Sequence, residues 1–143
     1  MDNADLKVIG KAKELAKHTY ILTTNVDRFP KKVRHSLVDK MQIKCLEIYE
    51  ALFEANRINN KTHKNERCER ITDAITYCDE LQFFIELSMD LGYVKDKSAG
   101  YWSGLVTDVK RMSIAWRTSE RKYHKGSQDD GCRFGVKEQQ ARG

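Results

Sequence analysis

Apolar residues recur at alternating steps of three and four in the segment 98–124. The pattern is sustained for about three heptads. It places one apolar stripe along a helix and suits packing at a shallow crossing angle against other helices. More than any other feature, it restricts the chain to a bundle of long helices. The stripe consists of Trp102, Leu105, Val109, Met112, Trp116, Ser119 and Tyr123.

Three further segments, 5–25, 30–56 and 66–91, show the same helical periodicity. The polar stretch 59–65 predicts a loop between the second and third helices. Gly92 is a typical helix stop, and Asp96 or Ser98 is a typical N-cap for the last helix. The aligned positions are Leu6, Ile9, Ala12, Ala16, Thr19 and Thr23 in the first segment, Leu37, Met41, Cys45, Ile48 and Leu52 in the second, and Ile71, Ile75, Cys78, Ile85 and Met89 in the third.

The single proline, Pro30, separates the first two segments. Proline lacks an N–H and is tolerated in the first turn of a helix, so it predicts that one helix ends and another begins here. Lys31, Lys32 and Arg34 follow at once. A helix N-terminus carries positive partial charge and disfavours cations, so an anionic partner is one candidate reason for their position.

The sequence therefore predicts an all-α fold, an up-down-up-down four-helix bundle over residues 1–125. The last residues differ in composition and predict a disordered tail over 126–143. Half of the eight glycines fall in that tail, at Gly126, Gly131, Gly135 and Gly143.

Several function classes find no support in the sequence. No apolar run approaches the ~18 residues that span a bilayer, and no signal-peptide pattern is visible, which predicts a cytoplasmic protein without membrane contact. No known catalytic or nucleotide-binding motif occurs, so we expect no enzyme activity and no catalytic residues. His18, His35, His63 and His124 lie in four different segments without ligand spacing. Glu-x-x-His pairs of di-iron bundles are also absent, so no metal or cofactor is expected.

The net charge of +5 conceals a segregation along the chain. Residues 1–44 carry ten basic and five acidic side chains, residues 45–91 five basic and ten acidic, and residues 92–143 eleven basic and six acidic. Such asymmetry suggests that different surfaces have different partners.

Basic residues cluster in the first and last helical segments, which lie side by side in an up-down bundle. We expect them to form one lateral patch that binds the phosphate backbone of a nucleic acid, with the residues after Pro30 at the opposite end. The alternative is a merely solvated face. Tyr20, Tyr101, Trp102 and Trp116 mostly fit the core, so no base-stacking platform is expected. The candidate nucleic-acid-binding residues are Lys7, Lys11, Lys17, Lys31, Lys32, Arg34, Lys110, Arg117, Arg121 and Lys122.

The segment 66–91 carries more apolar residues than one stripe needs. A helix that is apolar all round is buried on more than one side. A subunit interface is the preferred interpretation, and a wide core wrapped by the neighbouring helices is the alternative. The candidate interface residues are Phe83, Phe84, Leu87 and Leu91.

The run LTTNVDRFPKKVR, Leu22–Arg34, resembles the junction of helices 1 and 2 in a family of small four-helix bundles. This family includes the accessory variability determinant proteins of diversity-generating retroelements and the proteins encoded in 23S rRNA intervening sequences. The resemblance covers about residues 5–123. It continues in LEIYEALFEA from Leu46, MDLGY from Met89, YWSGL from Tyr101 and AWRTS from Ala115.

The resemblance implies a homopentameric ring of bundles with a basic surface. It implies association with a reverse transcriptase and with template-repeat RNA or cDNA, in support of mutagenic reverse transcription. The intervening-sequence proteins usually carry an Asn-Ile-Ala-Glu-Gly stretch in helix 2, where this chain has EANRI from Glu54, so the accessory variability determinant branch is the closer one. The alternative is an intervening-sequence-type bundle, a structural or protein-interaction oligomer that binds no nucleic acid.

Overall fold

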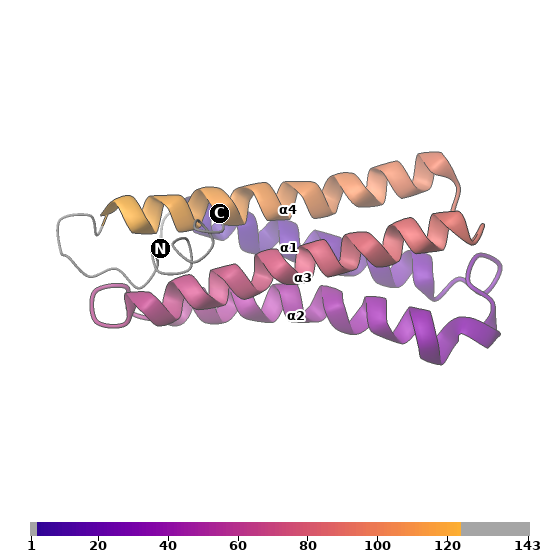
Figure 1. Ribbon diagram of the computed structural model, residues 1–143, viewed down its shortest axis with the longest axis horizontal. Coiled ribbons are helices and arrows are strands. Elements are labelled where there is room, and N and C mark those ends of the chain that lie inside the picture. The colour runs from indigo at the N-terminus through magenta and orange to yellow at the C-terminus, as the bar shows by residue number, and fades with distance from the viewer. Residues whose placement is uncertain (1–2, 124–143) are drawn as a thin grey trace, which may run out of the picture.

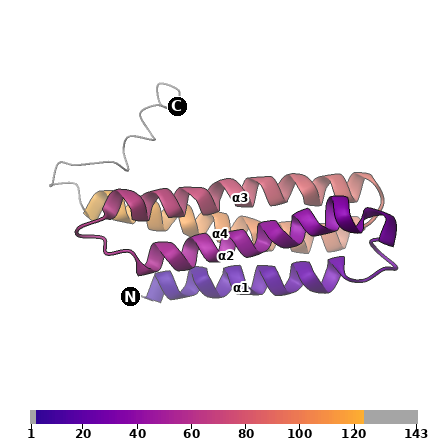
Figure 2. The same cartoon turned by 90° about the horizontal axis from the view of Figure 1, so that it is seen from below.

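A computed structural model describes residues 3–123, with side chains from residue 7 to residue 122. These residues form four α-helices and no strand: α1 (Asn3–Thr23), α2 (Asp39–Arg57), α3 (Lys64–Asp90) and α4 (Asp96–Tyr123). Figures 1 and 2 show the helices running alternately up and down, side by side. α1 and α3 each pack against both α2 and α4. The all-α prediction is confirmed, and the predicted tail lies outside the described residues.

The start of the second helical segment differs from the expected continuous helix. Pro30 takes an extended conformation (φ −62°, ψ 156°), a 3₁₀ turn covers Lys31–Val33, and a π-helical stretch covers Arg34–Val38 before α2 begins. The N–H of Asp39 donates to the carbonyl of Arg34, five residues back. The wider turn allows the consecutive residues Leu37 and Val38 both to be buried.

The loop between α1 and α2 is fixed to the end of the bundle by Phe29, which is buried. The backbone N–H of Phe29 donates to the carbonyl of Asn25 at 2.9 Å, and the Asn25 side chain accepts from the N–H of Asp27 at 2.9 Å. The Phe29 ring meets Trp102 edge-on with centroids 6.4 Å apart and lies 5.7 Å from the ring of Tyr93. These contacts close the junction end of the bundle with neutral groups.

The end of α3 is the glycine stop that the sequence indicates. Gly92 has φ 86°, a left-handed conformation that strains residues with a Cβ. Its N–H donates to the carbonyl of Met89 at 3.0 Å, and the N–H of Tyr93 donates to the carbonyl of Ser88 at 2.9 Å. This is a Schellman motif, which satisfies the last carbonyls of the helix.

The buried stripe of α4 departs from the predicted one towards its C-terminal end. Trp102, Leu105, Val109 and Trp116 are buried as expected, but Met112 is only partly buried and Ser119 is exposed. Ser113 and Glu120 are buried in their place. A straight α-helix drifts about 20° per heptad from a 3.5-residue repeat. The predicted positions 112 and 119 and the buried positions 113 and 120 therefore lie near the same face of α4. Hydrophobicity favoured Met112 over Ser113 in the prediction, and the side chain of Tyr123 lies outside those that the structure describes.

Two hydrogen bonds tie α1 to its neighbours inside the core. The indole Nε1–H of Trp102 donates to the hydroxyl of Thr19 at 2.9 Å, and both residues are fully buried. The amide of Gln42 donates to the hydroxyl of Thr23 at 3.0 Å. A buried donor that loses its acceptor costs about 1–3 kcal/mol, so these contacts fix the register of α1 against α4 and α2.

Candidate functional site

The expected lateral patch of basic residues is divided between two flanks of α4. On the α3 side, Lys110 lies 2.6 Å from the carboxylate of Asp79, and Arg117 donates to the hydroxyl of Thr72 at 3.0 Å. On the α1 side, Lys11 lies 3.7 Å from the carboxylate of Asp108. Lys110 and Arg117 therefore do not join Lys11 in one patch, because the apolar stripe of α4 separates them.

Acidic groups neutralise part of the α1 side of α4. Asp108 binds Arg111 at 2.7 Å as well as Lys11, and Lys11 also lies 3.5 Å from Glu14. Lys7 and Lys17 are exposed on α1, and Lys122 is exposed in the last turn of α4. This flank is a solvated surface with mixed charges, close to the alternative that the sequence left open.

The ends of α3 and α4 enclose a buried ion pair that the sequence analysis missed. The Nε of Arg67 lies 3.7 Å from an oxygen of Glu120, and both side chains are about nine-tenths buried. The guanidinium of Arg67 also donates to the carbonyl of Ile58 at 3.3 Å and lies 5.2 Å from the ring centroid of Trp116. Arg67 thus joins α3 to α4 and to the end of α2. Arg67 lies four residues before Ile71, on the apolar stripe of α3, and this position could have indicated from the sequence that Arg67 is buried.

Arg117 and Arg121 lie on the same flank of α4, one helical turn apart. Burial lowers the pKa of Arg117, and the charge of Arg121 lowers it further. Burial also lowers the pKa of Arg121. Two guanidinium groups are thus partly withdrawn from water next to each other.

The cations after Pro30 occupy the opposite end of the molecule from the C-terminal end of α4 (Figure 1). Lys31, Lys32 and Arg34 are all exposed, and none forms an ion pair within residues 3–123. Arg34 also lines a small cavity of about 250 Å³ between the end of α1 and the π-helical stretch. These three residues remain a compact basic cluster, as the sequence indicates.

Two of the four aromatic residues assigned to the core are exposed instead. Trp102 and Trp116 are buried, but Tyr101 is 57% exposed and Tyr20 is 37% exposed. The ring of Tyr101 meets His18 edge-on at 5.0 Å, across α4 and α1. Burial lowers the pKa of His18; the charge of Glu14 opposes this effect and that of Arg28 adds to it. An exposed aromatic pair therefore exists on the α1 side that the sequence analysis did not foresee.

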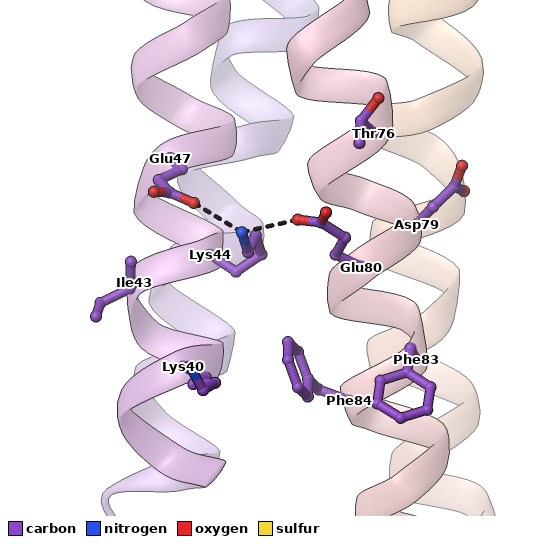
Figure 3. Close-up of a pocket in the computed structure, with 9 residues that line it drawn as sticks. All are labelled: Lys40, Ile43, Lys44, Glu47, Thr76, Asp79, Glu80, Phe83 and Phe84. Atoms are coloured by element: carbon purple, nitrogen blue, oxygen red, sulfur yellow. Dashed lines mark ion pairs between the residues drawn. The ribbon is translucent and has the colours of Figure 1, made fainter. Parts of the chain in front are cut away.

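A groove of about 580 Å³ runs between α2 and α3 (Figure 3). Its apolar wall comes from Ile43, Phe83 and Phe84, and charged residues line the rest. Ile43 and Phe83 are 54% and 57% exposed, unusually open for side chains of their size. Lysine, threonine and acidic side chains complete the lining: Lys40, Lys44, Glu47, Thr76, Asp79 and Glu80.

Lys44 crosses the floor of this groove. Its ammonium lies 2.9 Å from Glu47 and 2.7 Å from Glu80, as the dashed lines in Figure 3 show. It also lies 4.8 Å from the ring centroid of Tyr77. Burial lowers the pKa of Lys44, but the hydrogen bonds to Glu80 and Glu47 outweigh this effect, so the pKa is raised. The groove therefore combines an apolar wall with a lysine ammonium that two carboxylates bind.

The four candidate interface residues of α3 divide into two pairs. Phe83 and Leu91 are exposed, at 57% and 55%. Phe84 and Leu87 are partly buried and pack against the core. The apolar excess of α3 thus serves in part a wide core, the alternative interpretation, and in part an open surface.

The chain matches no protein-family model, no curated protein and no solved structure. Within residues 3–123, no helix is long and apolar enough to cross a membrane. The same residues contain no group of three or more His, Cys, Asp and Glu side chains placed to hold a metal ion. A function is therefore inferred from the structure itself, chiefly from its two basic ends and the groove between α2 and α3.

Proposed function

We propose that this protein is a non-enzymatic, oligomeric, cytoplasmic nucleic-acid-binding subunit. In keeping with the family resemblance, its role is that of an accessory variability determinant of a diversity-generating retroelement. It binds the reverse transcriptase and the template RNA or cDNA, and supports mutagenic reverse transcription without chemistry of its own.

The observation that supports binding most strongly is the position of the unneutralised cations. Lys31, Lys32 and Arg34 have no acidic partner within the described residues, whereas Lys11 and Lys110 lie against Asp108 and Asp79. A phosphate backbone satisfies such cations without sequence preference, and binding releases counterions. We therefore expect RNA and DNA to bind with strong dependence on salt.

The binding proposal is tested with fluorescently labelled single-stranded RNA and DNA, titrated with the full chain and followed by anisotropy at low salt. Saturable binding of either strand supports the proposal. Absence of binding at ~50 mM salt would contradict it, because electrostatic association is strongest there.

Assembly is supported by the open apolar residues of α2 and α3. Scattered apolar side chains are normal on a monomer, but Phe83 and Ile43 share one groove, and an exposed apolar groove typically marks an interaction site. A ring built head to tail needs two unlike surfaces on each subunit, and we assign the groove to one of them. The family resemblance sets the proposed number of subunits at five.

The assembly prediction uses two aromatic residues of equal exposure. Phe83→Asp places a charge in the apolar groove and is expected to reduce the oligomer to smaller species, since burying an unpaired carboxylate is costly. Tyr101→Asp, a matched control on the opposite side at the same 57% exposure, is expected to leave the assembly intact. Light scattering measures the mass against the 16.6 kDa chain. A wild-type mass of one chain would refute assembly.

A second candidate function follows from the same groove. An intervening-sequence-type bundle that only oligomerises or binds another protein needs the apolar surface but not the basic ends. It predicts that Phe83→Asp alters assembly while no nucleic acid binds. The two experiments above therefore separate the candidates.

A further inference from the structure

Arg117 and Arg121 differ from the cations around them in how their charge is balanced. Lys110, on the same flank, lies against Asp79, and Arg67, in the core beside it, lies against Glu120. Arg117 has only the neutral hydroxyl of Thr72, at 3.0 Å. Neither Arg117 nor Arg121 forms an ion pair within residues 3–123.

The position of Arg121 alone has an ordinary explanation. A helix C-terminus carries negative partial charge and stabilises cations in its last turn, which accounts for Arg121 and Lys122. This effect falls off within one turn, and Arg117 lies six residues before the end of α4. The dipole therefore does not explain why Arg117 is also held partly buried.

Partial burial makes the two guanidinium groups costly to leave without an anion. The Nε atoms of Arg117 and Arg121 are shielded from solvent and have no hydrogen-bond partner. Burial lowers both pKa values, and the neighbouring positive charge lowers that of Arg117 further. A shared anion would remove the mutual repulsion and supply acceptors for both side chains.

A phosphate group matches this arrangement in charge and in shape. Guanidinium groups present planar, fixed pairs of donors that bind phosphate oxygens bidentately. Thr72 limits the freedom of Arg117 before any ligand arrives, and such preorganisation reduces the entropy lost on binding. By contrast, Lys31 and Lys32 are exposed and flexible, and would act as point charges.

We propose that Arg117 and Arg121 form a phosphate-binding site on the α3-facing flank of α4, and that its ligand is the phosphodiester backbone of a single-stranded nucleic acid. This inference rests on the proposed nucleic-acid-binding function and assigns part of that function to two residues. The site lies at the far end of the bundle from the cluster Lys31, Lys32 and Arg34 (Figure 1).

The test compares two double variants that change the net charge equally. Arg117→Gln/Arg121→Gln is expected to weaken binding of a labelled single-stranded RNA at least about tenfold. It should also reduce the steepness of log affinity against log salt by about 0.7, since the two arginines share one phosphate and each phosphate contact on a single strand contributes about 0.7. Lys11→Gln/Lys110→Gln removes two cations that carboxylates already neutralise, and is expected to weaken binding less than about threefold.

A conservative variant separates a binding role from a folding role. Arg117→Lys/Arg121→Lys keeps the charge but loses the planar pairs of donors, and is expected to weaken binding several-fold while circular dichroism shows the helices intact. Wild-type affinity in this variant would refute bidentate binding. Equal effects of the two Gln variants would refute the site but leave the proposed function standing. If the wild-type chain itself binds no RNA, the function and the site both fail.

Discussion

The two ends of the bundle carry similar numbers of basic residues in opposite environments. At the junction end, Lys31, Lys32 and Arg34 lie in water above a neutral core of Phe29, Trp102 and Thr19. At the far end, arginines enter the interior. Arg67 is buried with Glu120, and Arg117 and Arg121 are partly buried on α4.

This difference in burial shows that the number of basic residues alone does not describe a binding surface. Solvated lysines contribute long-range attraction that salt screens, whereas partly buried arginines contribute directed hydrogen bonds in a less polar environment. In the proposed function, the junction end attracts the nucleic acid over a distance and the far end holds a phosphate in one place. The same contrast predicts that the two ends respond differently to mutation.

The largest effect is expected when the ion pair at the far end is broken. Glu120→Leu leaves Arg67 buried without its carboxylate and should lower the free energy of unfolding by about 3–5 kcal/mol in urea denaturation. Glu80→Leu removes a half-exposed partner of Lys44 and should cost no more than about 1 kcal/mol. An equal loss of unfolding free energy in the two variants would show that the buried ion pair does not stabilise the far end.

A smaller loss of stability is expected from the neutral core of the junction end. Thr19→Val keeps the shape of the side chain but leaves the indole N–H of Trp102 without its acceptor, which should cost about 1–3 kcal/mol. Thr24→Val removes an exposed hydroxyl that bonds the carbonyl of Tyr20 and should change stability by less than about 0.5 kcal/mol. If Thr19→Val cost as little stability as Thr24→Val, the hydrogen bond from Trp102 to Thr19 would not stabilise the core.

The smallest change in stability is expected from the two thiols buried in the middle of the bundle, Cys45 and Cys78, as long as the pH stays near neutral. Burial raises the pKa of the Cys45 thiol to about 11 and that of Cys78 to about 12, from 9.0. The unfolded chain therefore loses these protons first, so stability is retained below pH 9 and falls as the pH rises towards 11–12. Both thiols should resist a thiol reagent at pH 8 unless the bundle opens. Rapid labelling in the native state would contradict their burial.

The fold could be predicted from the sequence because its signals are local and repeated. The apolar stripes of α2 and α3, the stop at Gly92 and the break at Pro30 each follow from the chemistry of a few neighbouring residues. The π-helical stretch Arg34–Val38 could not be foreseen, because the packing of Leu37 and Val38 against the other helices decides it. Such tertiary contacts override local helix geometry.

The candidate site was less predictable because side-chain direction depends on partners. The sequence predicts that Arg117 lies with the lysines of α1, but its side chain donates a hydrogen bond to Thr72 of α3. Hydrophobicity favoured Met112 for the stripe of α4. The burial of Glu120 could not be foreseen, because it depends on Arg67 from another helix. A buried charge is recognised from sequence only when its partner is known, and no local pattern identifies that partner.

In the proposed function, unneutralised cations at both ends of the bundle bind a phosphate backbone. The most direct test is the slope of log affinity against log salt for the full chain with single-stranded RNA between about 50 and 200 mM. Three junction cations and two arginines predict a slope steeper than about −2, at about −0.7 for each phosphate contact. A slope near zero, or no binding at the lowest salt, would contradict the claim.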